Sequence, residues 1–139
     1  MNVAVRYYSK TGNTKKVAQE IAKQLQVVAK SIDSPLDRPV DQLFLGGAIH
    51  NASMDHQLKD YAAQLDPQKV GQVVMFGTSG AILTIGHGLE KALKANHISV
   101  SQSQLFLHGM LPNKKALKTN EREQIAMFVR RATEHFVEG

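Results

Sequence analysis

Hydroxyl and amide side chains gather around one glycine in a short segment near the N-terminus. The segment reads Ser9-Lys10-Thr11-Gly12-Asn13-Thr14. It follows an alternating run over residues 3–8 that is typical of a buried strand, and it precedes apolar residues spaced as on one face of a helix. A turn from a strand into a helix points backbone N–H groups, and the positive end of the helix dipole, at whatever lies above the sheet. The segment therefore predicts an anion site, most simply for a phosphate.

The residues present exclude three other phosphate chemistries at this turn. A P-loop NTPase needs Gly-x4-Gly-Lys-Ser/Thr, but no glycine precedes Ser9 and Asn13 stands at the lysine position. The dinucleotide fingerprint Gly-x-Gly-x-x-Gly is also absent. The chain has no cysteine, so it cannot use a cysteine nucleophile. What remains is non-covalent capture of a phosphate monoester by the hydroxyls of Ser9, Thr11 and Thr14 and the N–H groups of residues 10–14.

Two further glycine-containing segments follow predicted strands, over residues 46–53 and residues 77–88. In an open parallel sheet, ligands bind beyond the carboxyl ends of the strands. Together with the first turn, these segments could enclose a flat, phosphorylated ligand. The alternative is that their glycines only make tight turns, and composition leaves the two readings open.

The elements that must position these segments alternate along the chain, which favours an α/β fold with a mainly parallel sheet. Strands are predicted over residues 3–8, 26–32, 41–47, 70–76 and 105–107. Helices are predicted over residues 17–25, from 53 or 55 to 65, around 89–93, and from about 120. The last helix should bury Ile125, Phe128, Val129, Ala132 and Phe136. Residues 33–39 hold two prolines and are predicted to be irregular. We expect a single domain over residues 1–139.

Composition narrows the classes of partner. The net charge is +5 with a pI near 9.6, but the lysines are dispersed, so we expect no nucleic-acid binding. No apolar run reaches the roughly 18–20 residues that cross a bilayer. The chain has no cysteine and its histidines are not at metal-ligand spacing, so we expect no disulfide and no metal site. With no signal peptide before the first strand, we expect a cytoplasmic protein.

The first turn resembles the Ser/Thr-x-Thr-Gly-x-Thr phosphate loop of the flavodoxin-like family, which holds the phosphate of FMN. Residues 43–50 and 73–80 are similar to the third- and fourth-strand segments of that family. The resemblance covers essentially the whole chain, in the short form of the fold. It implies a flavodoxin-like open parallel five-stranded sheet in the order 2-1-3-4-5, with helices on both faces.

The resemblance also implies a cofactor and its site. The FMN phosphate would be held by Ser9, Lys10, Thr11, Gly12, Asn13 and Thr14. The isoalloxazine ring would be flanked by Ala48, Ile49, His50, Asn51, Thr78, Ser79, Gly80, Ile85 and His87. The implied function is electron transfer through bound FMN to a redox partner protein that the sequence does not identify. The alternatives are a small FMN-dependent NAD(P)H or quinone reductase, and a non-redox domain that binds another phosphorylated ligand or a protein.

Two features depart from the family pattern. The chain has no tryptophan, and its tyrosines, Tyr7, Tyr8 and Tyr61, lie outside the ring segments, so imidazole and isoleucine side chains would cover the ring. We expect this to weaken ring binding by roughly 1–2 kcal/mol, about tenfold in affinity. Electron-carrier flavodoxins are typically acidic, so a charge of +5 predicts a less reducing flavin, and docking toward an acidic partner surface or toward none in particular.

Overall fold

The structure is a computed structural model that describes residues 1–9, 12–50, 53–54, 56–78, 86–107 and 117–136. Side chains are described within these ranges except at residues 49–50, 53–54 and 86–87.

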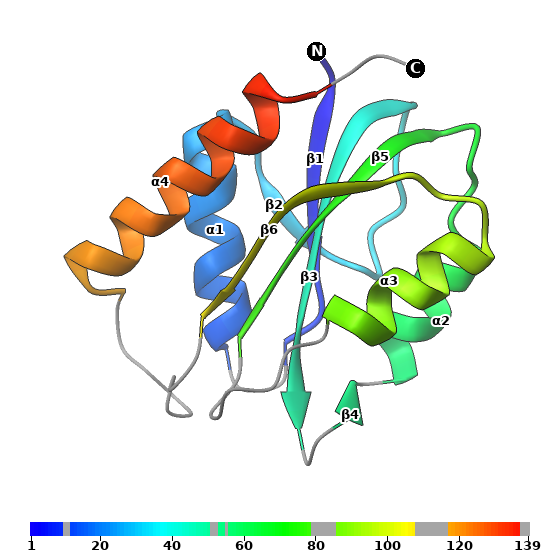
Figure 1. Ribbon diagram of the computed structural model, residues 1–139, viewed down its shortest axis with the longest axis horizontal. Coiled ribbons are helices and arrows are strands. Elements are labelled where there is room, and N and C mark those ends of the chain that lie inside the picture. The colour runs from blue at the N-terminus through cyan, green and yellow to red at the C-terminus, as the bar shows by residue number, and fades with distance from the viewer. Residues whose placement is uncertain (10–11, 51–52, 55, 79–85, 108–116, 137–139) are drawn as a thin grey trace.

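One parallel sheet forms the centre of the molecule (Figure 1). Its strands are β1 (Val3–Tyr7), β2 (Ala29–Ser31), β3 (Val40–His50), β5 (Val70–Thr78) and β6 (Val100–Leu107). Their spatial order is β2-β1-β3-β5-β6, with every neighbouring pair parallel. The predicted five-stranded order 2-1-3-4-5 is therefore confirmed. A two-residue strand that was not predicted, β4 (Ser53–Met54), pairs antiparallel with the end of β3.

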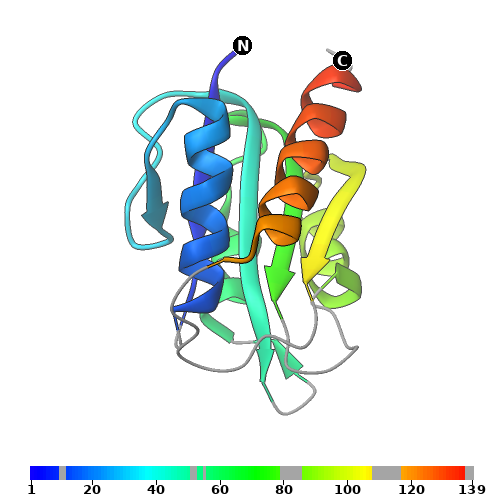
Figure 2. The same cartoon turned by 90° about the vertical axis from the view of Figure 1, so that its left-hand side faces the viewer.

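Helices cover both faces of this sheet, as predicted. Helices α1 (Asn13–Leu25) and α4 (Thr119–Glu134) lie side by side on one face, which Figure 2 shows in front of the sheet. Helices α2 (His56–Gln64) and α3 (Gly86–Ala95) pack together on the other face. None of the helices in the described ranges is long and apolar enough to cross a membrane.

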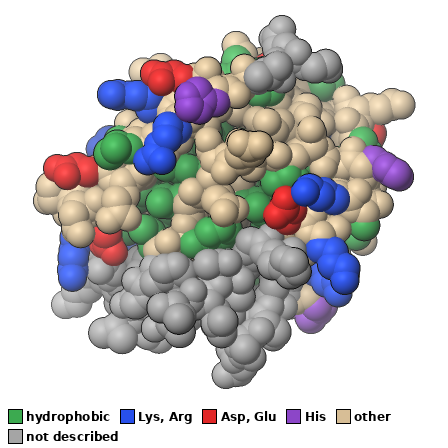
Figure 3. All heavy atoms as spheres, in the orientation of Figure 1, with side chains coloured by type: hydrophobic (Ala, Val, Ile, Leu, Met, Phe, Trp, Pro, Cys, Tyr) green, Lys and Arg blue, Asp and Glu red, His purple; other side chains and the backbone are tan. Residues whose placement is uncertain are grey.

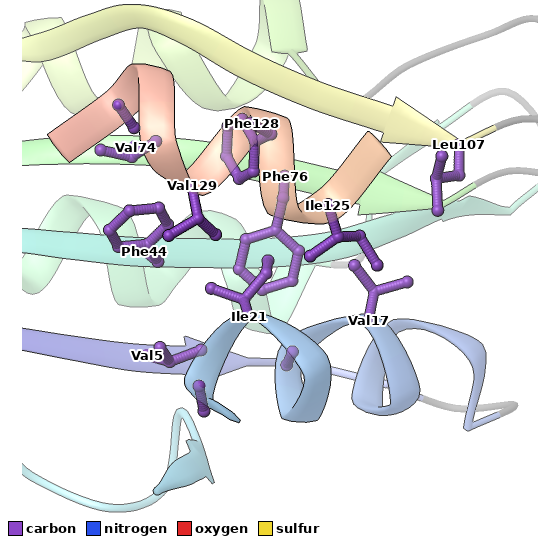
Figure 4. Packing of buried hydrophobic residues seen from close by; sticks show 13 residues of the cluster. Val5, Val17, Ile21, Phe44, Val74, Phe76, Leu107, Ile125, Phe128 and Val129 are labelled. Carbon is purple, nitrogen blue, oxygen red and sulfur yellow. The ribbon is translucent and has the colours of Figure 1, made fainter. Parts of the chain in front are cut away.

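The two faces bury cores of different composition. Between the sheet and α1 and α4, the rings of Phe44 and Phe128 meet edge to face, with centroids 5.8 Å apart and planes at 83° (Figure 4). Phe76 is fully buried between these helices and the sheet. The buried residues of the opposite cluster have no aromatic ring, and those from its helices include Leu58 and Leu93.

Two glycines of β3 serve this packing. A Cβ on Gly46 would overlap the ring of Phe76, and a Cβ on Gly47 would overlap the side chain of Leu58. Both residues lie inside the strand, where each lets a core side chain approach the backbone. The expectation of glycines that make a turn or approach a ligand is therefore wrong for Gly46 and Gly47.

Several predicted boundaries also change, each for a local reason. Strand β2 is shorter than residues 26–32 because Gln26 ends α1 in the left-handed conformation, at φ 60°, and the Val27 N–H donates to the Ala22 carbonyl. Strand β3 extends to His50 because β4 pairs with its end. That pairing also delays the start of α2 to His56. Phe136 is half-buried and lies beyond the end of α4, so its predicted burial in that helix is wrong.

Candidate functional site

The predicted site segments leave the same edge of the sheet. Parallel pairing sets Tyr7 of β1 beside Gly46 of β3, and Ala48 of β3 beside Thr78 of β5. The turn from β1 into α1 therefore lies at the carboxyl ends of the neighbouring strands β1 and β3. The strand order reverses at this position, which is where open α/β sheets bind ligands.

The conformation of the first turn depends on a left-handed glycine and on a hydrogen bond to a serine hydroxyl. Gly12 has φ 89° and ψ −11°, in the left-handed region that other residues rarely adopt. Its N–H donates to Ser9 Oγ at 3.0 Å, and its carbonyl accepts from the Lys16 N–H at 3.1 Å. Among the described residues other than its chain neighbours, no atom lies within 4 Å of the position where a Cβ on Gly12 would stand. A left-handed glycine and a serine hydroxyl thus set the conformation of this turn.

A buried hydroxyl pair joins this turn to β5. Thr14 Oγ1 and Thr78 Oγ1 are 2.9 Å apart, and the two residues are 1% and 5% exposed. Two hydroxyls carry two protons, and one proton makes their mutual hydrogen bond. The other can be donated to an acceptor at the edge of the sheet. Because Ser9 Oγ accepts from Gly12, its own proton is also available to a ligand.

The N-terminus of α1 has an unbalanced positive charge. Its first turn contains Lys15 and Lys16 and no acidic residue, and Gly12 provides no side-chain cap. A cation at this end of a helix opposes the macrodipole, by roughly 0.3–1 kcal/mol for an exposed side chain. A bound anion would offset this repulsion and accept hydrogen bonds from the first N–H groups.

The structure brings together only part of the predicted site. Within the described residues, the Ser9 hydroxyl bonds the Gly12 N–H, and the Thr14 hydroxyl bonds that of Thr78 from β5. Lys10, Thr11, Asn51, Ser79, Gly80 and Ile85 lie outside the described residues. Asn13 begins α1 and is buried. The position of the ring between the later segments stays a prediction.

The ring-flanking candidates also occupy elements that were not expected. Ala48, Ile49 and His50 belong to β3 rather than to a loop after it, and Ala48 is buried. Thr78 is the last residue of β5, and His87 lies in the first turn of α3. The β3–β4 pairing is the reason for the first difference.

A buried cation on the α2–α3 face was not singled out from the sequence. Arg6 of β1 is 5% exposed, and its guanidinium donates to the carbonyls of Val5, Ser34 and Pro35 at 3.0 Å each. These bonds fasten the irregular connection before β3 to the sheet. Burial raises the pKa of the Tyr61 hydroxyl, and the charge of Arg6 partly opposes that rise. The only signal for Arg6 was a charged residue in an apolar strand.

Metal chemistry has no support in the described residues, which contain no cluster of histidine and acidic side chains suited to a metal ion. The described part of the sheet edge combines a left-handed glycine, hydroxyl donors and a helix N-terminus with basic residues, which are features suited to binding an anion.

Residues 4–132 match the family model described as a flavodoxin domain. The chain belongs to the flavodoxin family. Its solved structural neighbours include a flavodoxin from the domain Archaea, with a TM-score of 0.76 and 17% identity, covering 96% of this chain and 97% of that chain. Oxidised flavodoxin 2 from Bacillus cereus has a TM-score of 0.73 and 19% identity, and the match covers 98% of this chain and 100% of that chain. The apo form of an NADH:FMN oxidoreductase has a TM-score of 0.70 and 15% identity, and the match covers 100% of this chain and 92% of that chain. No curated protein matches this flavodoxin-family chain.

Proposed function

We propose that this flavodoxin binds FMN non-covalently at the carboxyl edge of its sheet and transfers electrons through it. Family membership over residues 4–132 supports a flavin-dependent redox role, and the neighbours from Archaea and from Bacillus cereus are themselves flavodoxins. A third is named for FMN chemistry. Bound FMN supplies one- and two-electron chemistry, while the protein positions it and limits access of water.

The observation that carries the proposal is the linked hydroxyl site at the first turn. A phosphate monoester needs several hydrogen-bond donors and a positive potential, and the turn combines both. Ser9 has a free hydroxyl proton, and the Thr14–Thr78 pair has one more. Lys15, Lys16 and the α1 dipole supply the potential. The described donor set therefore fits the phosphate end of FMN.

In this proposal the residues act in two groups. Ser9 to Thr14 hold the phosphate through hydroxyl and N–H groups, and Thr78 fixes the hydroxyl of Thr14 from the neighbouring strand. Residues 48–51 and 78–87 flank the ring and exclude water from it. Since no tryptophan or tyrosine occurs in these segments, the phosphate contacts supply a larger share of the binding free energy than in a flavodoxin with stacked aromatics.

A titration of the purified chain with FMN tests the proposal. We expect quenching of FMN fluorescence and visible flavin absorbance that stays with the protein on a sizing column. The double variant Thr11→Ala/Thr14→Ala should weaken FMN binding far more than riboflavin binding, because riboflavin lacks the phosphate. The matched control is Thr133→Ala, whose hydroxyl bonds the Val129 carbonyl within α4. A protein that leaves FMN fluorescence unchanged contradicts the proposal.

The specific role we propose is that of an electron carrier. A carrier reduces and oxidises its FMN only through a partner protein, whereas a reductase oxidises NAD(P)H directly. We expect the FMN-loaded protein not to oxidise NADH or NADPH with a quinone, and to accept electrons from a flavodoxin reductase. Its net charge of +5 should give a less negative midpoint potential than that of an acidic flavodoxin. Direct, saturable NADH oxidation would instead favour the reductase.

A further inference from the structure

The surface formed by α4 and the outer edge of β6 has no role in the proposed flavin site. Within the described residues β6 pairs only with β5, so its other edge has no strand partner there. Its sequence, Val-Ser-Gln-Ser-Gln-Leu-Phe-Leu, contains no charged residue and no proline. Natural edge strands usually carry such residues, which prevent pairing with another chain. The register irregularity in β6 precedes Gln104, so the last four residues offer a regular edge.

A hollow separates this strand from α4. Its volume is about 520 Å³, and it is lined by Gln102, Ser103, Gln104, Leu105, Gln124, Met127, Phe128, Arg131 and His135. Leu105 and Phe128 give it an apolar floor, and none of its lining residues is acidic. Met127 belongs to this lining and is 57% exposed, so its apolar side chain is accessible to a partner.

Along α4, the charges are arranged symmetrically about Met127. Glu123 precedes it by four residues and Arg131 follows it by four, so all three lie along one side of the helix. Each charge is about 6 Å from Met127 along the axis, at 1.5 Å per residue. Both side chains are exposed, and neither makes an ion pair with another described residue. Figure 3 shows acidic and basic side chains beside a hydrophobic one over α4.

We propose that this surface binds a second copy of the chain in a two-fold symmetric dimer. A two-fold interface must be complementary to itself. Antiparallel α4 helices centred on Met127 place Glu123 opposite the partner's Arg131, and Arg131 opposite the partner's Glu123. Each flexible Met127 side chain then enters the hollow of the other copy, against Leu105 and Phe128. The uncharged edges of β6 lie beside this contact.

Helix α4 and strand β6 are each long enough to extend across an interface of ordinary size. A stable contact buries roughly 800 Å² on each partner. Helix α4 is about 24 Å long by its 16 residues at 1.5 Å each. Strand β6 is about 26 Å long by its 8 residues at 3.3 Å each. The hollow between them is lined by residues of both elements.

Charge reversal tests the arrangement without reference to flavin. Glu123→Arg alone, or Arg131→Glu alone, creates two like-charge contacts in a homodimer, and each should raise the dimer dissociation constant at least tenfold in sedimentation equilibrium. Mixing the two variants restores opposite charges at both contacts, so native mass spectrometry should detect the heterodimer and neither homodimer. Lys69→Glu, an exposed charge reversal in the turn before β5, should leave the dissociation constant unchanged.

Two further variants separate this contact from other assemblies. Met127→Glu should abolish the dimer, and Gln104→Lys should weaken it, while circular dichroism shows that both variants remain folded. A wild-type chain that is monomeric up to its solubility limit overturns the proposal. A dimer that survives each single charge reversal, or a mixture that forms no heterodimer, overturns it as well.

Discussion

Helices α1 and α4 pack on the same face of the sheet, but their N-termini are completed in opposite ways. At α4, Lys118 has an extended backbone, and its N–H donates to the Glu121 carboxylate at 2.8 Å. The same carboxylate complements the positive end of the dipole. At α1, the preceding residue is a left-handed glycine without a side-chain cap, and the first turn holds two lysines.

The N-terminus of α4 is stabilised by its own residues, whereas the N-terminus of α1 is arranged for a ligand. The sequence of α4 supplies its own anion, so this end gains nothing from an external one. The sequence of α1 supplies positive charge, and a glycine without a side-chain cap at the position where a capping residue ordinarily stands. We infer that α1 reaches its full stability only with an anion bound.

The largest expected effect is the affinity contributed by the phosphate. Hydrogen bonds to a charged group contribute roughly 1.5–3 kcal/mol each, so two of them predict that FMN binds at least about a hundredfold tighter than riboflavin. Fluorescence titrations of the wild-type chain with the two flavins measure this ratio. The ratio should fall as salt is added, because exposed Lys15 contributes to it. Equal affinities would remove the distinction between the two helix ends.

Much of this architecture could be predicted from the sequence, because strand and helix periodicities are local properties. The sheet order and the helix faces followed from the element order and the family resemblance. The two-residue β4 could not be predicted, since so short a segment has no periodicity. The sequence also could not show that Gly46 and Gly47 make room for core side chains, because close packing and the approach of a ligand both favour glycine.

The first turn was predictable from its hydroxyls and glycine, but its link to β5 was not. Thr14 and Thr78 are 64 residues apart, and their contact depends on the register that sets Ala48 beside Thr78. Register is fixed by packing of the whole sheet rather than by the residues at its edge. The same limit applies to Arg6, whose partners are carbonyls of a distant, irregular segment.

The conformation of Gly12 should give the next largest effect. Gly12→Ala places a Cβ in open space but forces a left-handed backbone on alanine, which costs about 1–2 kcal/mol of unfolding free energy. Lys118→Ala is the matched change at α4, where the backbone is extended and the stability should change by only a few tenths of a kcal/mol. Urea unfolding of the ligand-free variants measures both. Equal losses would contradict the contrast between the two turns.

Removing the internal anion of α4 should have a smaller effect. Glu121→Ala loses the hydrogen bond to the Lys118 N–H and the favourable charge at the dipole, for about 1 kcal/mol of unfolding free energy. FMN affinity should not change, because this helix end lies outside the proposed phosphate site. A loss of FMN binding in the folded variant would show that α4 contributes to the site after all.

The smallest expected effect has opposite signs for stability and for binding. Lys15→Glu supplies α1 with the acidic residue that its first turn lacks, and should stabilise the ligand-free protein by about 0.3–1 kcal/mol. It should also weaken FMN binding, because the new carboxylate repels the phosphate. Lys23→Glu makes the same charge change in the last turn of α1, where a base is favourable, so it should destabilise the protein and leave FMN affinity nearly unchanged. Since both variants have the same net charge, only the position along the dipole distinguishes them. If both shift stability in the same direction, the net charge of the chain, rather than an anion site at the start of α1, accounts for the two lysines.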